Sequence, residues 1–266
     1  MNRNGIFALC FNALFALFMV GPLLIVIGVS FTPTGYLEFP PSAISFRWFK
    51  AILDNPDFID AAWISLELGL ASATLSTVLA VPAALAIGRE RFRGRDALQG
   101  LFLSPLTVPT VVLGVAFLRF LSLFDINGTF FGLVLCHAVI VTPFVLRLVL
   151  ASVTGVDRSI EMAATSLGAS HWTVFRRVTL PLILPGVVGG WVLAFITSFD
   201  ELTVTVFIVN PSTTTLPVRL FSHITQTTDP LIASISTMVI LLTVLLMLAV
   251  NKLYGLDRLL IGGEAR

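Results

Sequence analysis

Charged residues are scarce in this chain, and their scarcity excludes an ordinary soluble fold. Only 12% of the 266 residues are charged, 56% are hydrophobic, and the mean hydropathy is +0.97. Soluble domains carry about a quarter charged residues. We therefore expect the lipid bilayer to be the solvent of most of the chain. The formal net charge of +1 adds little, because the placement of charge matters more than its sum in a membrane protein.

Cysteine and histidine are too few and too scattered for a metal or redox site. Cys10 and Cys136 lie in apolar runs without metal or redox spacing, and we interpret them as small packing residues. His137, His171 and His223 are far apart in the predicted topology, so we expect no catalytic residues and no metal ligands. The sequence also has no GxxxxGK[ST] phosphate loop, so the chain is not expected to be an enzyme or to hydrolyse ATP.

Six apolar runs are each long enough to cross a bilayer. A membrane helix needs about 20 residues to span about 30 Å of hydrocarbon, and its backbone hydrogen bonds must be satisfied internally. The alternating ten-residue segments of a membrane barrel do not occur. The sequence predicts an all-α integral membrane protein with six transmembrane helices in one domain, residues 1–266. The runs are Ile6–Phe31, Ala61–Ile87, Leu98–Leu121, Gly132–Val153, Leu182–Val209 and Leu231–Leu253.

The distribution of lysine and arginine predicts the orientation. If the N-terminus lies in the cytoplasm, only Arg47, Lys50, Arg119 and Arg219 of the 16 basic residues fall outside. The positive-inside rule therefore favours cytoplasmic placement of both termini. The first run is longer than the apolar part of a signal peptide, about 7–15 residues, so we interpret it as an uncleaved span.

The first outside loop contains the segment SFRWFKAILDNPDF, which predicts a short helix on the membrane surface. Trp48, Phe49 and Phe58 would be its interfacial anchors. The pattern fits a contact for an external partner and a simple aromatic belt equally well.

The longest polar interruption in the second half of the chain is the stretch EMAATSLGASHWTVFRRVTLPLILPG, residues 161–186. Ser159–Leu167 predicts one helix, and Gly168 permits a turn that a side chain would hinder. Ala169–Arg177 predicts a second short helix. Proline disfavours a helical residue before it, so this helix is expected to end at Leu180-Pro181, where the next span begins.

The second short helix has two distinct faces. Trp172 and Phe175 lie one turn apart, whereas Ser170, Thr173 and Arg177 line another face. The aromatic pair could insert into a groove of a partner protein. An amphipathic helix that rests on lipid headgroups fits the pattern equally well.

This stretch resembles the EAA loop of permease subunits of bacterial ABC importers. The family pattern is Glu-Ala-Ala, three residues, Gly, nine residues, an aliphatic residue, one residue and Leu-Pro. Met162 stands where the pattern has Glu, and Glu161 lies one residue earlier. Whether the family's salt link from this Glu is kept therefore stays open. The matching positions are Ala163, Ala164, Gly168, Val178, Leu180 and Pro181.

The resemblance extends over essentially the whole chain and implies a type I ABC importer permease fold in the bacterial inner membrane. It implies a cytoplasmic coupling loop at about residues 155–181 that docks into a cleft of an ATPase. The implied partners are two ATPase copies that use ATP and Mg²⁺, a second and non-identical permease subunit, a periplasmic or extracellular solute-binding protein and membrane lipid. The chain itself is expected to bind no cofactor and no nucleic acid. The implied coupling residues are Glu161, Ala163, Ala164, Gly168, Ala169, Ser170, Trp172, Phe175, Arg176 and Arg177.

Shorter motifs resemble the polyamine-type members of that family. They are FRGR at Phe92–Arg95, SLGAS at Ser166–Ser170 and SFDE at Ser198–Glu201. The expected solute is therefore a polyamine or a similar cation. Relatives with the same motifs carry iron, thiamine, phosphonates or opines, so the solute stays open. A stand-alone secondary transporter and a membrane anchor for an enzyme complex are the rival functions.

Two acids, Asp200 and Glu201, lie about midway along the fifth apolar run. A carboxylate at the centre of a spanning helix costs about 2.5–3.5 kcal/mol on insertion scales, so it usually faces a cavity or a partner. Our hypothesis is that one of them lines the passage and balances a cationic solute. The alternative is an internal polar contact, for example with Ser198 or Thr203.

Three aromatic residues, Trp191, Phe195 and Phe199, are spaced four apart before these acids. Such a stripe could stack on cations or methylenes of a solute, or it could simply pack helices together. Glu67 in the second run is a further intramembrane acid, open to the same two interpretations as Asp200 and Glu201.

Overall fold

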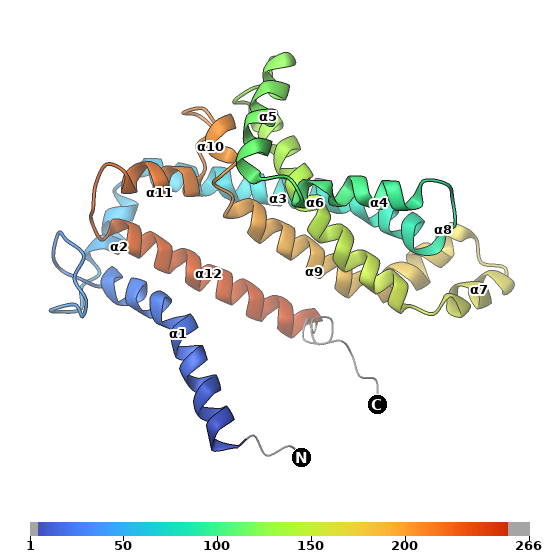
Figure 1. Cartoon of the computed structure of the whole chain (residues 1–266), viewed down its shortest axis with the longest axis horizontal. Helices are drawn as coiled ribbons and strands as arrows, with labels where there is room; N and C mark the ends of the chain where they lie inside the picture. The colour runs from blue at the N-terminus through green and yellow to red at the C-terminus, as the bar shows by residue number, and fades with distance from the viewer. Residues whose placement is uncertain (1–4, 255–266) are drawn as a thin grey trace. The chain divides into compact units, whose positions relative to one another are not determined.

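The structure is a computed structural model that describes residues 5–254. Within these residues the chain forms helices joined by turns, and none of the described residues lies in a β-strand (Figure 1). The predicted all-α class is therefore confirmed. The chain divides into two compact units. The first combines the segment up to Asp60 with Leu220–Leu245, and the second is built on Ala61–Arg219.

The first unit contains α1, Ile6–Ser30, and the short helix α2, Arg47–Leu53. Most of α12, Leu231–Tyr254, also belongs to it. Ser234 in α12 donates its hydroxyl to the carbonyl of Ser30 at the end of α1, 3.1 Å away. This contact joins two segments far apart in the sequence.

The second unit contains the remaining helices. The long helix α3 crosses into it from the first unit, and α11 leads back out. The bounds are α3 Pro56–Arg89, α4 Arg95–Leu103, the 3-10 turn Ser104–Leu106, α5 Thr110–Leu123, α6 Phe130–Gly155, α7 Arg158–Ser166, α8 His171–Val174, the π-helical turn Phe175–Thr179, α9 Leu180–Phe199, α10 Thr205–Ile208 and α11 Leu216–Ile224.

Five described helices are long and apolar enough to cross a membrane: Ile6–Ser30, Pro56–Arg89, Phe130–Gly155, His171–Phe199 and Leu231–Ala249. A sixth span is broken, because Arg95–Leu106 and Thr110–Leu123 meet at an angle of 101°. The prediction of one continuous third span, Leu98–Leu121, was therefore wrong in that respect. Pro109 lies at the break with an extended backbone (φ −55°, ψ 130°) and has no N–H to continue a helix.

The core of the second unit is centred on α6. In its apolar window 61% of the residues are buried, against 33% or less in the other four spans. Gly186 on α9 allows the close approach of α6, because a Cβ atom there would lie 2.8 Å from the carbonyl oxygen of Leu148. The lack of a side chain at Gly186 therefore lets α6 and α9 pack closely against each other.

The fifth predicted span, Leu182–Val209, is also not one helix. It ends at Phe199, and regular helix resumes only at Thr205. Asp200 and Glu201 therefore lie at a break, and the prediction that both acids lie within a spanning helix was wrong. The side chain of Glu201 explains the break, as described below.

Candidate functional site

Two short helices joined by a glycine turn form the polar stretch, as predicted. The side chain of Asp157 accepts the backbone N–H of Ser159, 2.8 Å away, at the start of α7. This hydrogen bond lowers the pKa of the Asp157 carboxyl below its ordinary value. Gly168 has φ +88°, which only glycine adopts freely. Ser170 then caps α8 by accepting the backbone N–H of Thr173 at 3.3 Å.

The second short helix does not end at Leu180-Pro181, and that prediction was wrong. His171–Phe199 is a single span of 29 residues, in which Leu180 has helical dihedrals (φ −59°, ψ −45°). The turn before Pro181, Phe175–Thr179, is π-helical. A π turn shifts the hydrogen bonds by one residue. Such a shift relieves the clash and the missing donor that proline imposes on an α-helix.

The tip of this loop presents an apolar surface. Trp172 is 67% exposed and Leu167 is 90% exposed. The rings of Trp172 and Phe175 lie 5.5 Å apart, as their spacing predicted. The other expected coupling residues lie on α7, in the turn before α8, or in the π-helical turn after α8. Ala163, Gly168, Ser170, Arg176 and Arg177 are exposed, and Glu161, Ala164 and Ala169 are half-buried.

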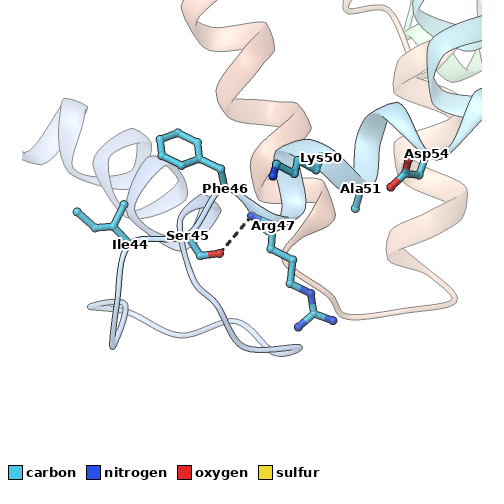
Figure 2. A pocket seen from close by; sticks show the side chains of 7 residues that line it. All are labelled: Ile44, Ser45, Phe46, Arg47, Lys50, Ala51 and Asp54. Carbon is cyan, nitrogen blue, oxygen red and sulfur yellow. Dashed lines mark hydrogen bonds between the residues drawn. The ribbon is translucent and has the colours of Figure 1, made fainter.

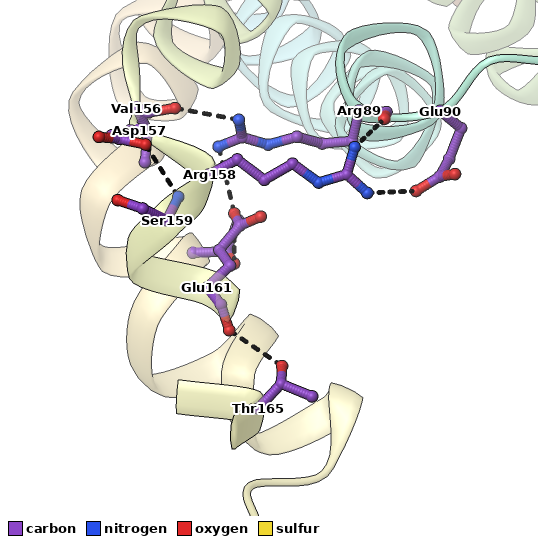
Figure 3. A network of polar contacts seen from close by, with 9 residues as sticks. Arg89, Glu90, Val156, Asp157, Arg158, Ser159, Glu161 and Thr165 are labelled. Atoms are coloured by element: carbon purple, nitrogen blue, oxygen red, sulfur yellow. Dashed lines mark hydrogen bonds and ion pairs between the residues drawn. The ribbon is translucent and has the colours of Figure 1, made fainter. Parts of the chain in front are cut away.

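Glu161 is the centre of a polar network behind this tip (Figure 3). Its Oε1 accepts Nη2 of Arg89 at 3.2 Å and the hydroxyl of Thr179 at 3.0 Å. Arg89 also donates to the carbonyl of Val156 at 3.0 Å. The two charged side chains are only 12% and 17% exposed. The salt link therefore exists in this chain and is made by Glu161, while Met162 is exposed.

This network joins three elements that the sequence could not connect. Arg89 ends α3, Glu161 lies on α7, and Thr179 precedes α9. Arg158 adds a hydrogen bond of 2.9 Å to the carbonyl of Arg89 and an exposed ion pair of 3.6 Å with Glu90 (Figure 3). From the sequence, Arg89 counted only among the basic residues expected on the cytoplasmic side, and nothing indicated its contact with this loop.

The two acids after α9 have different surroundings. The Glu201 carboxylate accepts the backbone N–H groups of Val204 and Thr205, each at 2.9 Å, and the Thr205 hydroxyl at 2.6 Å. It therefore caps α10 and creates the break. The side chain of Asp200 is exposed and has no hydrogen bond or ion pair within the described part of the chain. Asp200 is the acid that remains available to a ligand.

His137, which the sequence did not mark as functional, links both sides of this break. The ring is fully buried on α6. Its Nδ1 lies 2.8 Å from the hydroxyl of Ser198, near the end of α9, and its Nε2 lies 3.0 Å from the hydroxyl of Thr205, the first residue of α10. A single histidine in an apolar run carries no signal for such a contact, because both partners lie more than 60 residues away.

Replacing His137 with leucine is expected to destabilise the chain by about 1–3 kcal/mol, because two buried hydroxyls lose a hydrogen-bond partner. The measurement is thermal unfolding of the purified chain in detergent. The same substitution at the exposed His171 is the matched control and should change stability by less than about 0.5 kcal/mol. Equal melting temperatures for the two variants would contradict the role given to His137.

The three aromatic residues form a continuous stripe along α9. The rings of Trp191 and Phe195 are stacked at 5.8 Å with an interplanar angle of 6°, and those of Phe195 and Phe199 lie 6.0 Å apart. Trp191 donates its indole N–H to the hydroxyl of Thr74 on α3, 3.1 Å away. All three rings are half-buried. They can therefore contact a neighbouring molecule without unfolding the helix.

A shallow basic pocket lies on the first unit (Figure 2). The predicted surface helix exists as α2, and Arg47 and Lys50 on it line the pocket. The guanidinium of Arg47 lies 5.0 Å from the ring centre of Trp48. The interpretation of Phe58 as an interfacial anchor was wrong, because this residue is only 2% exposed. The remaining lining residues are Ile44, Ser45, Phe46, Ala51 and Asp54.

Known sequences resemble this chain over most of its length. The family model "Binding-protein-dependent transport system inner membrane component" matches residues 76–256. The spermidine/putrescine transport system permease protein PotC of Haemophilus influenzae is 32% identical, covering 85% of this chain and 87% of that protein. The putrescine transport system permease protein PotI of Escherichia coli is 31% identical, covering 84% of this chain and 82% of that protein. The putative 2-aminoethylphosphonate transport system permease protein PhnV of Salmonella paratyphi A is 30% identical over 91% of both chains.

Solved structures share the fold. A chain of a bacterial ABC transporter involved in the import of the acidic polysaccharide alginate superposes with a TM-score of 0.73 at 19% identity, covering 95% of this chain and 98% of that chain. A second structure is of the alginate transporter in complex with a periplasmic protein bound to alginate pentasaccharide. It gives a TM-score of 0.70 at 17% identity, covering 93% of this chain and 92% of that chain. At this identity the likeness concerns the fold alone.

Proposed function

This chain belongs to the family of binding-protein-dependent transport system inner membrane components, and on that premise we propose that it conducts a polyamine or a similar cation for an ATP-driven importer. Members of the family are multi-span transport subunits of the inner membrane rather than enzymes. The observation that carries the choice of solute is the carboxylate of Asp200, which is exposed, has no partner among the described residues and follows the aromatic stripe directly. A carboxylate next to aromatic faces suits an ammonium group.

The proposed assembly contains partners that this chain does not include. They are two copies of a cytoplasmic ATPase that uses ATP and Mg²⁺, a second and non-identical permease subunit, and an external solute-binding protein. Both termini lie in the cytoplasm, and residues 1–266 act as one transmembrane domain. A second permease is needed because six spans enclose only half of a pathway.

The continuous helix from His171 to Phe199 supports a mechanism for this proposal. ATP binding closes the ATPase dimer and moves the docked loop at Trp172. A helix of 29 residues is about 44 Å long. Because the helix runs without a break from α8 through the π-helical turn into α9, it carries that movement to Asp200 at its far end. The spans then open outward and receive the solute from the binding protein.

The proposal predicts that polyamines stimulate ATP hydrolysis by the complete complex in lipid, and that Asp200→Asn raises the KM for them about 10- to 100-fold. A hydrogen bond to a charged group contributes about 1.5–3 kcal/mol, which corresponds to that range. The measurement is ATPase activity against spermidine, putrescine, thiamine, ferric iron and 2-aminoethylphosphonate. Asp96→Asn, an exposed acid on α4, is the matched control.

A second candidate solute is 2-aminoethylphosphonate, because the relative PhnV covers 91% of this chain. Its amine could still pair with Asp200, but its phosphonate could not. Stimulation by this compound alone, with polyamines inactive, would contradict the proposed solute and keep the importer architecture. Transport without ATP or partners would contradict the importer proposal itself.

A further inference from the structure

Glu67 is an acid that the proposed pathway has not yet used. It lies on an exposed face of α3, together with Leu70, Ala71, Thr74 and Val78, which line a shallow hollow. Its carboxylate has no hydrogen bond or ion pair within the described residues. A carboxylate within an apolar span is costly against lipid, so this face must meet water, a charged ligand or another protein.

Two contacts give the register of α3 against α9. Thr74 bonds to Trp191, and a Cβ atom on Gly69 would lie 3.0 Å from the ring of Phe195. Residue numbers fall along α3 as they rise along α9, so the two helices are antiparallel. Continuing this register by two residues places Glu67 roughly level with residues 197–198, within about one helical turn of Asp200.

Two carboxylates without a partner among the described residues therefore lie at a similar depth. The aromatic stripe leads to Asp200, and its first ring, Trp191, bonds to Thr74 on the face of α3 that carries Glu67. We infer that Glu67 is a second ammonium-binding position, so that this chain recognises a solute with two ammonium groups joined by methylenes. Asp200 binds one ammonium group, Glu67 binds the other, and the ring of Phe199, which lies between their levels on α9, contacts the methylenes between them. Two like charges at one depth are unfavourable without a cation, which is why a doubly charged cation fits better than a neutral occupant.

This inference rests on the proposed function and names the solute class for the same site. The inference predicts that Glu67→Gln and Asp200→Asn raise the KM for the solute to a similar extent. Glu67 lies on α3 and Asp200 directly follows α9, more than 100 positions later in the sequence. The competing occupant of the Glu67 face is the second permease subunit. In that case the carboxylate would pair with a residue of that subunit and would not sense the solute.

The test uses the complete complex in lipid and compares putrescine, which has two ammonium groups, with the monoamine 1-aminobutane as a competitor. Glu67→Gln should raise the KM for putrescine about 10-fold and reduce the preference for putrescine over the monoamine by a similar factor. The elution volume of the complex should stay unchanged, which shows that the subunits remain assembled. Glu67→Asp, which keeps the charge, should retain most of the preference.

Each other outcome has a distinct meaning. An unchanged KM in Glu67→Gln, with putrescine still transported, would overturn this inference and leave the proposed function intact. Loss of the second permease subunit on size-exclusion would overturn it in favour of a subunit contact. If the wild-type complex responded to no diamine or polyamine, the proposed function would fail, and the inference would fail with it.

Discussion

Replacing Trp172 with alanine is expected to weaken binding of the ATPase about 30- to 1,000-fold, while the chain still inserts into the membrane. A buried aromatic anchor at a protein interface contributes about 2–4 kcal/mol. Trp172 is 67% exposed in this chain, so its truncation leaves no cavity in the fold. Phe175 lies beside it, with ring centres 5.5 Å apart, and the double variant should lose more than either single variant.

The measurement is co-purification and binding affinity of the ATPase with the permease complex in detergent. Trp63 provides a matched control, because it is 59% exposed and lies near the N-terminal end of α3, away from the loop. Trp63→Ala should leave ATPase affinity within a factor of about two. Unchanged affinity in Trp172→Ala would instead mean that this helix rests on lipid headgroups, the alternative that the pattern alone left open.

Glu161→Ala is expected to destabilise the loop by about 3 kcal/mol and to uncouple ATP hydrolysis from transport. Removal of one partner from a buried ion pair leaves the other charge uncompensated, which costs about 3–5 kcal/mol. Here Arg89 would keep only its hydrogen bond to the carbonyl of Val156. Thr179 would lose its acceptor as well, so α7 would lose its link to the start of α9 and would keep only the contacts of Arg158 to the end of α3.

The measurements are thermal unfolding of the purified complex and the ratio of solute transported to ATP hydrolysed. Glu90→Gln is the control within the same network, because its ion pair with Arg158 spans 3.6 Å and both side chains are more than half exposed. Exposed pairs contribute about 0–1 kcal/mol, so this variant should behave almost like the wild type. Equal effects of the two variants would refute a special role for the buried pair.

Local pattern predicted those features whose physical cause is local. Hydrophobic length predicted the spans, because backbone hydrogen bonds in lipid must be made within the helix. The glycine between two amphipathic segments predicted the turn at Gly168, because a positive φ excludes most other residues. The four-residue spacing of Trp191, Phe195 and Phe199 likewise predicted one stripe on one helix face.

Breaks in helices within apolar runs were harder to predict from the sequence. Hydropathy reports the length and composition of an apolar run. Neither quantity shows a change at Phe199, the residue at which α9 ends. The break depends on which N–H groups the Glu201 carboxylate accepts, and an acid in an apolar run does not reveal that choice. The reverse error occurred at Leu180-Pro181, where a proline predicted a break but a π-helical turn kept the helix continuous.

By itself, the sequence determined an all-helical membrane permease with a patterned polar loop, because apolar length, helix periodicity and glycine each act within a few residues. Only the tertiary structure decided which charges are paired. It placed Arg89 against Glu161, 72 positions away, and it used Glu201 as a cap while leaving Asp200 and Glu67 without a partner in residues 5–254. Pairing between distant side chains depends on how helices pack, and that packing leaves no trace in the periodicity of a single segment.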